Sequence, residues 1–300
     1  MSGELPKLPD RPTGGHKGTF GTVCVLGGQA SGPRIMIGGP ALSALAALRA
    51  GAGLAVLAVP APLVQAALTI APSATGLSLP TDEHGNLRPS AVAEVLDEHL
   101  AQFDCLAVGP GLGADAAQRQ IMARLVGREQ PPMVIDADAI NALAGLAGFD
   151  RDLRAAAVLT PHPGEYTRLA RALEIDADPV DPRQRPAAAE KLAQRIGCVV
   201  VLKGAGTVVS DGINTWTNTT GNPALATAGT GDVLTGVIAG LVAQYATRGE
   251  RSMSLYDCAR IGVYAHGLAA DRWREGAGAR GGMLAEDLLG ELPGVLVGLR

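Results

Sequence analysis

A glycine-rich run that leads directly into Asp232 carries the residue types best suited to phosphate chemistry in this sequence. Gly229 and Gly231 can take positive φ and lack a β-carbon, so backbone N–H groups beside them can converge on a small anion. An apolar helical pattern follows at once, and a helix N-terminus also favours an anion. The negative charge of Asp232 would repel a bound phosphate. Asp232 is therefore predicted to act on a group that accompanies or reacts with the phosphate, either as a base or as a ligand for Mg²⁺. The alternative is a flexible loop before a helix that Asp232 merely caps. The run consists of Ala228, Gly229, Thr230 and Gly231.

Four further polar residues follow buried, strand-like runs. Lys203 can extend its ammonium toward a phosphate, although a surface position at the sheet edge is the alternative. Asp136 and Asp138 could hold Mg²⁺ through water and phosphate oxygens, while Asp138 could instead cap the next helix. His162 lies between two prolines, which stiffen its loop and favour a ligand contact over a place in the core.

A second glycine-rich loop, Gly-Pro-Gly-Leu-Gly at residues 109–113, follows another apolar run. Such a loop lets the backbone approach a ligand closely, or simply turns a strand into a helix. Its spacing is not the G-x-G-x-x-G of nicotinamide-binding folds, and the sequence holds neither the P-loop pattern nor the serine-hydrolase pattern G-x-S-x-G. These residues therefore favour phosphoryl chemistry on a nucleotide without a P-loop.

Composition and charge exclude several other classes. The net charge is −4, the pI is near 5.8 and no basic run occurs, so a nucleic-acid partner is not expected. The cysteines are scattered without a C-x-x-C pair, which favours buried packing of Cys24, Cys105 and Cys198 over a zinc or redox site. No stretch is apolar and long enough to cross a membrane, and residues 1–18 form a polar, irregular arm unlike a signal peptide. We therefore expect a soluble cytoplasmic protein.

Apolar runs, glycine-rich turns and amphipathic stretches alternate along the chain. This alternation predicts an α/β fold with a mostly parallel sheet and helices on both faces, in one domain of residues 1–300. The predicted strands are 22–26, 54–59, 105–108, 133–135, 156–159 and 199–202, with a hairpin of 207–210 and 215–217. The predicted helices are 41–50, 62–71, 90–100, 114–126, 139–146, 166–173, 185–196, 233–242, 254–274 and 283–290.

The order of these elements also predicts where a ligand binds. Ligands of such sheets lie at the carboxyl ends of the strands, so the loops there should gather along one edge. Residues 73–88 are predicted to be a polar connection. Two histidines, His16 and His266, could also approach the site, whereas His84 and His99 are expected on the solvated surface. The loops expected to gather follow Leu26, Val108, Ile135, Leu159 and Leu202.

Seven segments occur in an order that is recognisable. They are HKGTFGTVCVLGG, LRAGAGL, GPGLG, DADAINAL, LTPHPGE, VVLKGAGTVV and TAGTGDVLTGVIAGL. Together they closely resemble the ADP-dependent NAD(P)H-hydrate dehydratase family, of ribokinase-like three-layer α/β/α fold, over roughly residues 14–290. TAGTGD alone is also similar to ribokinase-like kinases such as hydroxyethylthiazole kinase, but the combination of TPHPGE, VLKGAGT and AGTGD is specific.

The resemblance implies an enzyme that dehydrates the S epimer of hydrated NADH or NADPH while splitting ADP into AMP and phosphate, with Mg²⁺ and as a homotetramer. Many bacterial members carry an amino-terminal epimerase domain, for which this chain has no room. Asp232, His162, Gly111 and the small residue Gly39 would contact the hydrated nicotinamide; many members have alanine in place of Gly39. The residues implied to contact the adenine nucleotide are Lys203, Gly204, Ala205, Gly206, Thr207, Ala228, Gly229, Thr230 and Gly231.

The residues and the resemblance predict the same chemistry. Asp232 would take the proton from the hydroxyl of the hydrated ring, and the oxygen would attack the terminal phosphoryl of ADP. The metal ligands are not defined, and Asp136 is the candidate for a contact through water. One alternative is a kinase of the same fold that uses ATP on a hydroxymethyl or hydroxyethyl group of a thiazole or pyrimidine alcohol. The other is a nucleotide-binding regulator that has lost catalysis.

Overall fold

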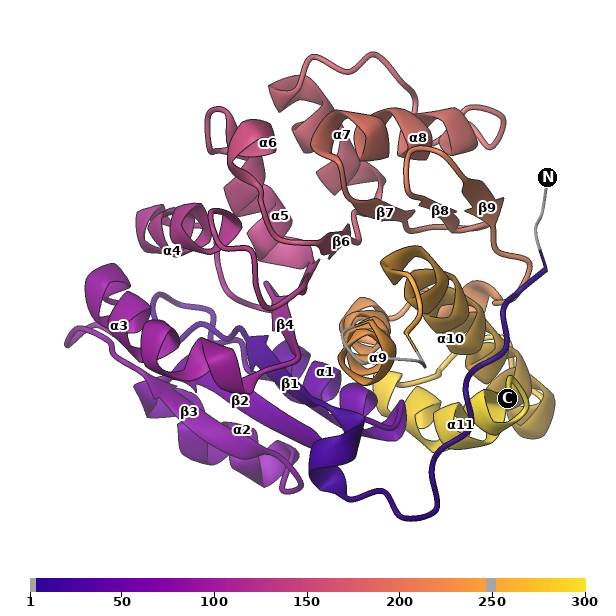
Figure 1. Cartoon of the computed structure of the whole chain (residues 1–300), viewed down its shortest axis with the longest axis horizontal. Helices are drawn as coiled ribbons and strands as arrows, with labels where there is room; N and C mark the ends of the chain where they lie inside the picture. Colours follow the sequence, from indigo (N-terminus) through magenta and orange to yellow (C-terminus); the bar gives the residue numbers. More distant parts are fainter. Residues whose placement is uncertain (1–3, 247–251) are drawn as a thin grey trace.

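Runs of β-branched and small apolar residues form one nine-stranded sheet in the described part of the chain, residues 4–246 and 252–300 of the computed structural model (Figure 1). The strand order is β3-β2-β1-β4-β5-β6-β7-β8-β9. Neighbours from β3 to β7 are parallel, whereas β8 and β9 are antiparallel and end the sheet as a hairpin. The strands are β1 (Thr22–Leu26), β2 (Leu54–Pro60), β3 (Thr75–Leu79), β4 (Cys105–Val108), β5 (Met133–Ile135), β6 (Ala157–Leu159), β7 (Val199–Leu202), β8 (Val208–Ser210) and β9 (Thr215–Thr217).

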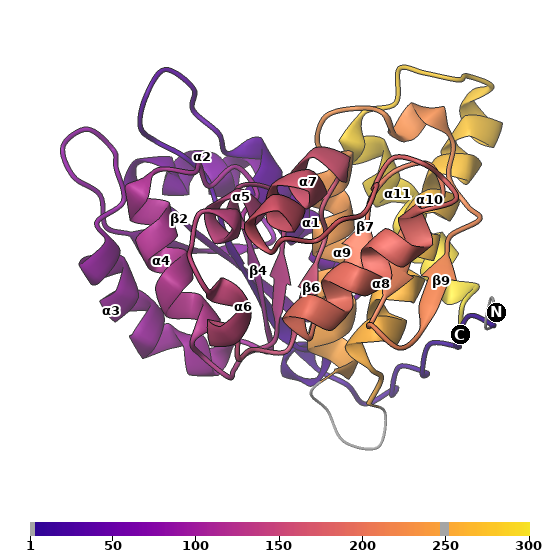
Figure 2. The ribbon, with the colours of Figure 1, turned by 90° about the horizontal axis from the view of Figure 1, so that it is seen from above.

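Helices cover both faces of the sheet and divide the core in two (Figures 1 and 2). Alternate strand residues face opposite cores: Val23 and Val25 of β1 pack into one, Cys24 and Leu26 into the other. The first core is completed by α1 (Gly38–Arg49), α2 (Val64–Ile70), α9 (Thr230–Tyr245), α10 (Leu255–Ala277) and α11 (Ala285–Val297), and the second by α3 (Pro89–His99), α4 (Ala116–Val126), α5 (Ala137–Ala144), α6 (Phe149–Asp152), α7 (Pro163–Ala172) and α8 (Arg185–Ile196). Short 3-10 helices are η1 (Lys17–Phe20), η2 (Ala61–Leu63), η3 (Leu100–Gln102) and η4 (Pro223–Leu225).

The largest departure from the sequence prediction is β3, which lies inside the connection predicted over residues 73–88. It pairs with β2 at the edge of the sheet. Its sequence, TGLSL, buries only Leu79 fully, so it contains no apolar run of the kind that marks the inner strands. The prediction of a connection was therefore wrong for Thr75–Leu79.

The ends of the chain also differ from the prediction. Leu8, in the predicted arm, is buried, and its N–H donates to the carbonyl oxygen of Leu299 at 2.7 Å. Residues 1–3 of that arm lie outside the described residues, and one domain over 1–300 stays a prediction. α11 continues to Val297, beyond the predicted end at residue 290. Helix ends were harder to predict than strands because α10 and α11 are held by packing on each other and on the first core.

All four cysteines are buried and free, which confirms the packing role predicted for Cys24, Cys105 and Cys198. Burial also raises the pKa of the Cys198 thiol to about 11. In residues 4–246 and 252–300, none of the helices combines the length and the apolar character that a membrane crossing requires.

The loops at the carboxyl ends of the parallel strands meet, as predicted. The N–H of Gly28, after β1, donates to Pro110 O at 3.1 Å, and the N–H of Lys203, after β7, donates to Pro161 O at 2.8 Å. Gly109 takes φ +122°, and a β-carbon there would lie 1.8 Å from the carbonyl oxygen of Asp136, so only glycine permits this approach. The chain changes direction across the sheet between β1 and β4, because β1 leads to α1 on one face and β4 to α4 on the other.

Glycines also bring α9 directly against α1. A β-carbon on Gly236 would lie 2.1 Å from the carbonyl oxygen of Ser43, and one on Gly240 would lie 2.7 Å from that of Ala47. The Ser43 hydroxyl donates to the carbonyl oxygen of Asp232 at 2.7 Å. This backbone-to-backbone crossing places the first turn of α9 beside the first turn of α1.

Candidate active site

Asp232 lies in the first turn of α9, where that helix crosses α1. Its carboxylate faces Gly39: a β-carbon at position 39 would lie 3.1 Å from Oδ1 and 3.2 Å from Oδ2. Asp232 is half-buried. Burial and the charge of Asp136 raise the pKa of Asp232 to about 7, against the opposing charge of Lys203. A partly exposed carboxylate with this pKa is suited to accept a proton near neutral pH.

Two backbone N–H groups at the start of α9 have no acceptor among the described residues. Gly229 precedes the helix with φ +90°, as predicted, whereas Gly231 is already helical and does not use positive φ. The N–H of Val233 donates to Gly229 O at 3.0 Å, but no acceptor among the described residues takes the N–H of Gly231 or of Asp232. These two groups, at the positive end of a helix, can bind an anion.

Lys203 extends from the end of β7 into the interior rather than to the surface. Its Nζ lies 2.6 Å from Oδ1 of Asp136 and 3.9 Å from Oε2 of Glu165, and its side chain is only 19% exposed. A β-carbon on Gly231 would lie 3.6 Å from the same Nζ, so the ammonium is next to the first turn of α9. The alternative of a surface lysine is therefore wrong.

Asp136 has a partner on each carboxylate oxygen. Oδ2 accepts a hydrogen bond from Thr235 of α9 at 2.7 Å, while Oδ1 takes the ammonium of Lys203. Burial would raise the pKa of Asp136, but Lys203 and the hydroxyls of Thr235 and Thr160 outweigh burial and lower it. Burial would likewise lower the pKa of Lys203, but Asp136 and Glu165 raise it. Both members of the ion pair are therefore charged.

Glu165, which the sequence places only at a helix start, belongs to this charged cluster. Its Oε2 accepts the N–H of His162 at 2.8 Å, which caps α7. Its Oε1 lies 3.4 Å from Nε2 of His162. Glu165 is buried, and burial raises its pKa to about 7. The sequence did offer one signal for Glu165, because it lies three residues after His162, the spacing of a capping box. That spacing predicts the start of a helix, but it does not predict that the acid faces Lys203.

His162 is half-exposed at the mouth of this cluster, with 50% of its side chain accessible. Nδ1 accepts the N–H of Gly164 at 3.0 Å, so the neutral ring carries its proton on Nε2, which faces Glu165. Burial and the charge of Lys203 lower the pKa of His162, which keeps the ring neutral at physiological pH. A neutral, oriented ring at the surface of the site is available to a ligand.

The loop after β7 presents exposed backbone at Gly204, Ala205 and Gly206. Gly204 takes φ +144° and Gly206 takes φ +63°, and the hydroxyl of Thr207 donates to Gly204 O at 2.9 Å. These contacts close the loop on itself while leaving its outer N–H groups accessible.

Arg185, at the start of α8, donates hydrogen bonds to the start of that loop. It was not identified as a functional residue from the sequence. It is buried; its Nη2 donates to the carbonyl oxygens of Leu202 at 2.8 Å and Lys203 at 3.2 Å, and its Nη1 donates to Pro179 O at 2.7 Å. An arginine in the first turn of an amphipathic helix gives no sequence signal of burial.

The loop at residues 109–113 carries two of the predicted residues. Gly111 is half-exposed, and a β-carbon there would lie 3.0 Å from the Cβ of Met36 and 3.8 Å from Pro40, next to Gly39. Asp138 does not cap α5: its Oδ2 accepts the N–H of Gly113 at 2.9 Å. The capping alternative was wrong because the N-cap position of α5 belongs to Asp136.

Of the four histidines other than His162, two lie where the sequence predicted and two do not. His266 of α10 is buried against the site, and its Nε2–H donates to the carbonyl oxygen of Thr230 at 2.9 Å. Burial lowers the pKa of His266 to about 4, so the ring is neutral. His16 precedes η1 at the amino end of β1, the opposite end of the sheet from the site, so that expectation was wrong. His84 is exposed, as predicted, but His99 is half-buried.

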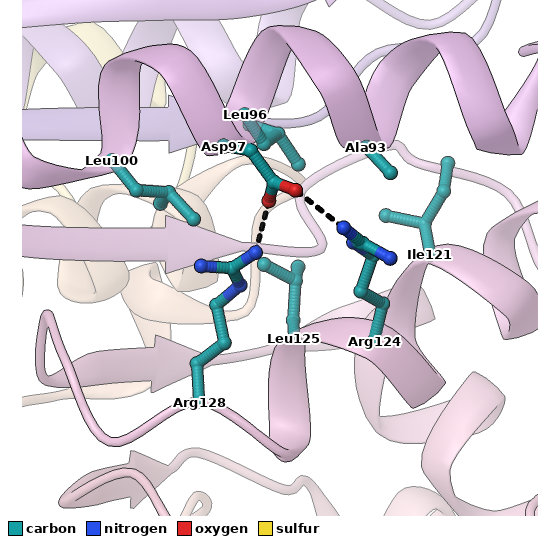
Figure 3. Close-up of a pocket in the computed structure, with 8 residues that line it drawn as sticks. All are labelled: Ala93, Leu96, Asp97, Leu100, Ile121, Arg124, Leu125 and Arg128. Atoms are coloured by element: carbon teal, nitrogen blue, oxygen red, sulfur yellow. Dashed lines mark hydrogen bonds and ion pairs between the residues drawn. The ribbon is translucent and has the colours of Figure 1, made fainter.

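A pocket between α3 and α4 lies apart from this site (Figure 3). Asp97 of α3 forms ion pairs there with Arg124 and Arg128, above apolar side chains of both helices. Its volume is ≈ 10 Å³, about enough for one water molecule, and no predicted site residue lines it. This pocket belongs to helix packing, not to substrate binding.

A direct metal cage is not formed by the residues that the structure describes. The described ranges contain no group of three or more His, Cys, Asp or Glu side chains that could hold a metal ion. Asp136 is occupied by Lys203 and Thr235, and Asp138 by Gly113. Magnesium, which keeps several waters and binds phosphate oxygens, would therefore have to be held mainly by a ligand's own phosphates.

A mostly parallel sheet with helices on both faces, together with a carboxylate at a helix N-terminus that has N–H groups unused within the described residues, is typical of the ribokinase-like class. The chain belongs to the NAD(P)H-hydrate dehydratase family, whose model matches residues 23–294. The fold and the family predicted from the sequence are therefore both confirmed.

Relatives and solved structures agree with this assignment. A bifunctional NAD(P)H-hydrate repair enzyme of Moorella thermoacetica is 41% identical over 294 residues, which is 97% of this chain and 52% of the relative. The chain thus spans about half the length of the curated relatives it matches. An ADP/ATP-dependent NAD(P)H-hydrate dehydratase of Bacillus subtilis, co-crystallised with ATP and Mg²⁺, superposes with a TM-score of 0.75 at 27% identity and covers 99% of both chains. A ribokinase-like superfamily protein of Enterococcus faecalis has a TM-score of 0.77 at 26% identity, covering 98% of this chain and 92% of the other.

Proposed function

We propose that this chain dehydrates the S epimer of hydrated NADH and NADPH and converts ADP to AMP and phosphate. The observation that carries the proposal is the place of Asp232, beside the unused N–H groups of Gly231 and of Asp232 itself and close to Lys203. A terminal phosphoryl group bound at those N–H groups would lie next to the carboxylate. Gly39 lies against Asp232, and Gly111 lies against Pro40, the residue after Gly39. We propose that these two glycines and His162 contact the hydrated nicotinamide.

The reaction follows from this placement. Asp232 takes the proton from the ring hydroxyl, and the oxygen attacks the terminal phosphorus of ADP while the bond to the AMP oxygen breaks. The resulting phosphate ester leaves as inorganic phosphate, driven by the lone pair of the ring nitrogen, and loss of the neighbouring C–H proton restores the ring double bond. The N–H groups of α9 and the ammonium of Lys203 stabilise the charge on the transferred group.

The adenine nucleotide would lie along the exposed backbone of residues 204–206, with Thr207 and the run 228–231 completing its site. ADP is the proposed phosphoryl donor, and Mg²⁺ would arrive with its phosphates and neutralise their charge when bound. We also propose a cytoplasmic homotetramer, without nucleic-acid or membrane partners. Sedimentation analysis tests the oligomeric state, and a monomer or dimer would contradict it.

The test of the activity is a direct assay. Hydrated NADH or NADPH is mixed with the protein, Mg²⁺ and either ADP or ATP, and the return of reduced-nicotinamide absorbance is followed together with AMP and phosphate. One phosphate per restored nicotinamide supports the proposal. A phosphorylated thiazole or pyrimidine alcohol formed from ATP, with no restored nicotinamide, would instead identify a kinase.

The role of Asp232 has its own test. Asp232→Asn keeps the shape of the side chain but cannot accept the proton, so turnover should fall by at least about a hundredfold. ADP affinity, measured by calorimetry, should change little. Near-normal turnover of a variant that binds ADP normally would show that another group is the base.

A further inference from the structure

Helix α9 carries the proposed base, Asp232, and also Thr235, which bonds the carboxylate that pairs with Lys203. Thr235 follows Asp232 by one turn of α9, so the two side chains share a face of the helix. Thr235 is fully buried, and its hydroxyl bonds Asp136 Oδ2 at 2.7 Å. Through Asp136, α9 is thus connected to the Nζ of Lys203, which lies 2.6 Å from the other carboxylate oxygen.

Several carboxylates lie near Lys203, and in the structure its ammonium is in hydrogen-bond contact with only one of those described, Asp136. Its Nζ is in hydrogen-bond contact with Asp136 and more distant, at 3.9 Å, from Glu165. Among the described residues no ion pair of 4.0 Å or less joins Lys203 to Asp232, although Gly231 is adjacent to the ammonium. The ion pair with Asp136 therefore keeps the ammonium of Lys203 near the first turn of α9 but out of ion-pair contact with Asp232.

We propose that Thr235 and Asp136 are positioning residues that hold the Lys203 ammonium for the phosphates of the nucleotide and away from the carboxylate of Asp232. Thr235 orients the carboxylate of Asp136, and that carboxylate fixes the flexible side chain of Lys203. The inference rests on the proposed function for its kinetic part, but nucleotide binding tests it separately.

A matched pair of variants isolates the Thr235 hydroxyl. Thr235→Val has nearly the same shape but cannot donate to Asp136, whereas Thr235→Ser keeps the donor and loses only a methyl group. We expect Thr235→Val to weaken ADP binding about fivefold to tenfold by calorimetry, the scale of one ordinary hydrogen bond. Thr235→Ser should stay within about twofold, even if both variants lower the melting temperature by similar amounts. Equal ADP affinities for the two variants would overturn the inference.

A double-mutant cycle separates positioning from a general packing effect. If Thr235 acts through the lysine, Thr235→Val should weaken ADP binding in the wild-type background but not in a Lys203→Ala background. Additive losses would show that Thr235 does not act through Lys203. Asp136→Asn tests the middle step and should change ADP affinity in the same direction as Thr235→Val but by more, about tenfold or above.

The kinetic readout distinguishes this inference from the proposed function. With hydrated NADH as substrate, Thr235→Val should raise the KM for ADP and also lower kcat, because a released Lys203 can pair with Asp232. If the wild-type chain binds ADP but restores no nicotinamide, the proposed function fails while the calorimetric cycle still decides the inference. A cycle without coupling, in an active enzyme, would refute the inference alone.

Discussion

Gly39 of α1 and Asp232 of α9 meet so closely that a β-carbon on Gly39 would lie 3.1 Å from the carboxylate oxygen Oδ1. The contact exists because Gly236 and Gly240 let the two helices cross backbone to backbone. The environment of the proposed base is therefore determined partly by a residue with no side chain. A methyl group at position 39 would therefore press on the carboxylate of Asp232, which would have to shift by a few tenths of an ångström.

Gly39→Ala should fold normally and shift the pH dependence of activity. The added methyl group would cover one side of the Asp232 carboxylate, and greater burial raises the pKa of a carboxyl group further. The rising limb of kcat/KM against pH should therefore move to higher pH. Gly38→Ala is the control, since a β-carbon at Gly38 has no neighbour within 4 Å. Identical pH profiles for the two variants would contradict this account.

Gly236→Ala should destabilise the fold. The new methyl group would lie 2.1 Å from Ser43 O, so α1 and α9 must separate. We expect the free energy of unfolding to fall by about 1–3 kcal/mol, the usual cost of overpacking, in urea titrations. Gly290→Ala, at an exposed position inside α11 without neighbours within 4 Å, should instead raise it by about 0.5–1 kcal/mol. A Gly236→Ala variant as stable as wild type would show that the crossing can relax.

Asp232 should make the wild-type protein less stable as the pH rises. Its pKa is about 7 in the folded state against 3.8 ordinarily, so between these values the folded state binds a proton that the unfolded state has lost. The stability contributed by this proton is complete below about pH 4 and is lost as the pH rises through about 7. Asp232→Asn removes the titration. Its melting temperature should therefore exceed that of wild type at pH 8, and the difference should shrink toward pH 4. A difference that grows in acid would refute the raised pKa.

Arg185→Met should loosen the loop at residues 203–207, the proposed nucleotide site. Removing the guanidinium leaves the carbonyl oxygens of Pro179, Leu202 and Lys203 without these donors. We expect a loss of about 1–3 kcal/mol in the free energy of unfolding and weaker ADP binding. Arg183→Met, two residues earlier and exposed, is the matched control and should change neither quantity. Unchanged ADP affinity in Arg185→Met would show that the loop keeps its shape without the arginine.

Much of the fold was predictable because its signals are local. Four inner strands, β1, β4, β5 and β7, agree with their predicted limits, since buried parallel strands are continuous apolar runs. β3 was missed because an edge strand needs no such run. Likewise, the sequence predicted that Lys203 lies at the carboxyl edge of the sheet because it follows a buried strand, and that Asp232 begins a helix because it follows a glycine-rich run.

The sequence by itself determined the order of the strands and helices, the glycine-rich turns and the residue types that reach one edge of the sheet. Only the tertiary structure decided which charges pair there. Asp136 lies 67 residues from Lys203 and 99 from Thr235 along the chain, and no local pattern says which of several nearby carboxylates the lysine will choose. That choice depends on distances of a few ångström between loops, set by the close crossing of α1 and α9 and by the hydrogen bonds of Arg185 to the loop after β7. Coulomb energy in a partly buried site varies steeply over such distances, so packing, not sequence spacing, settled the electrostatics.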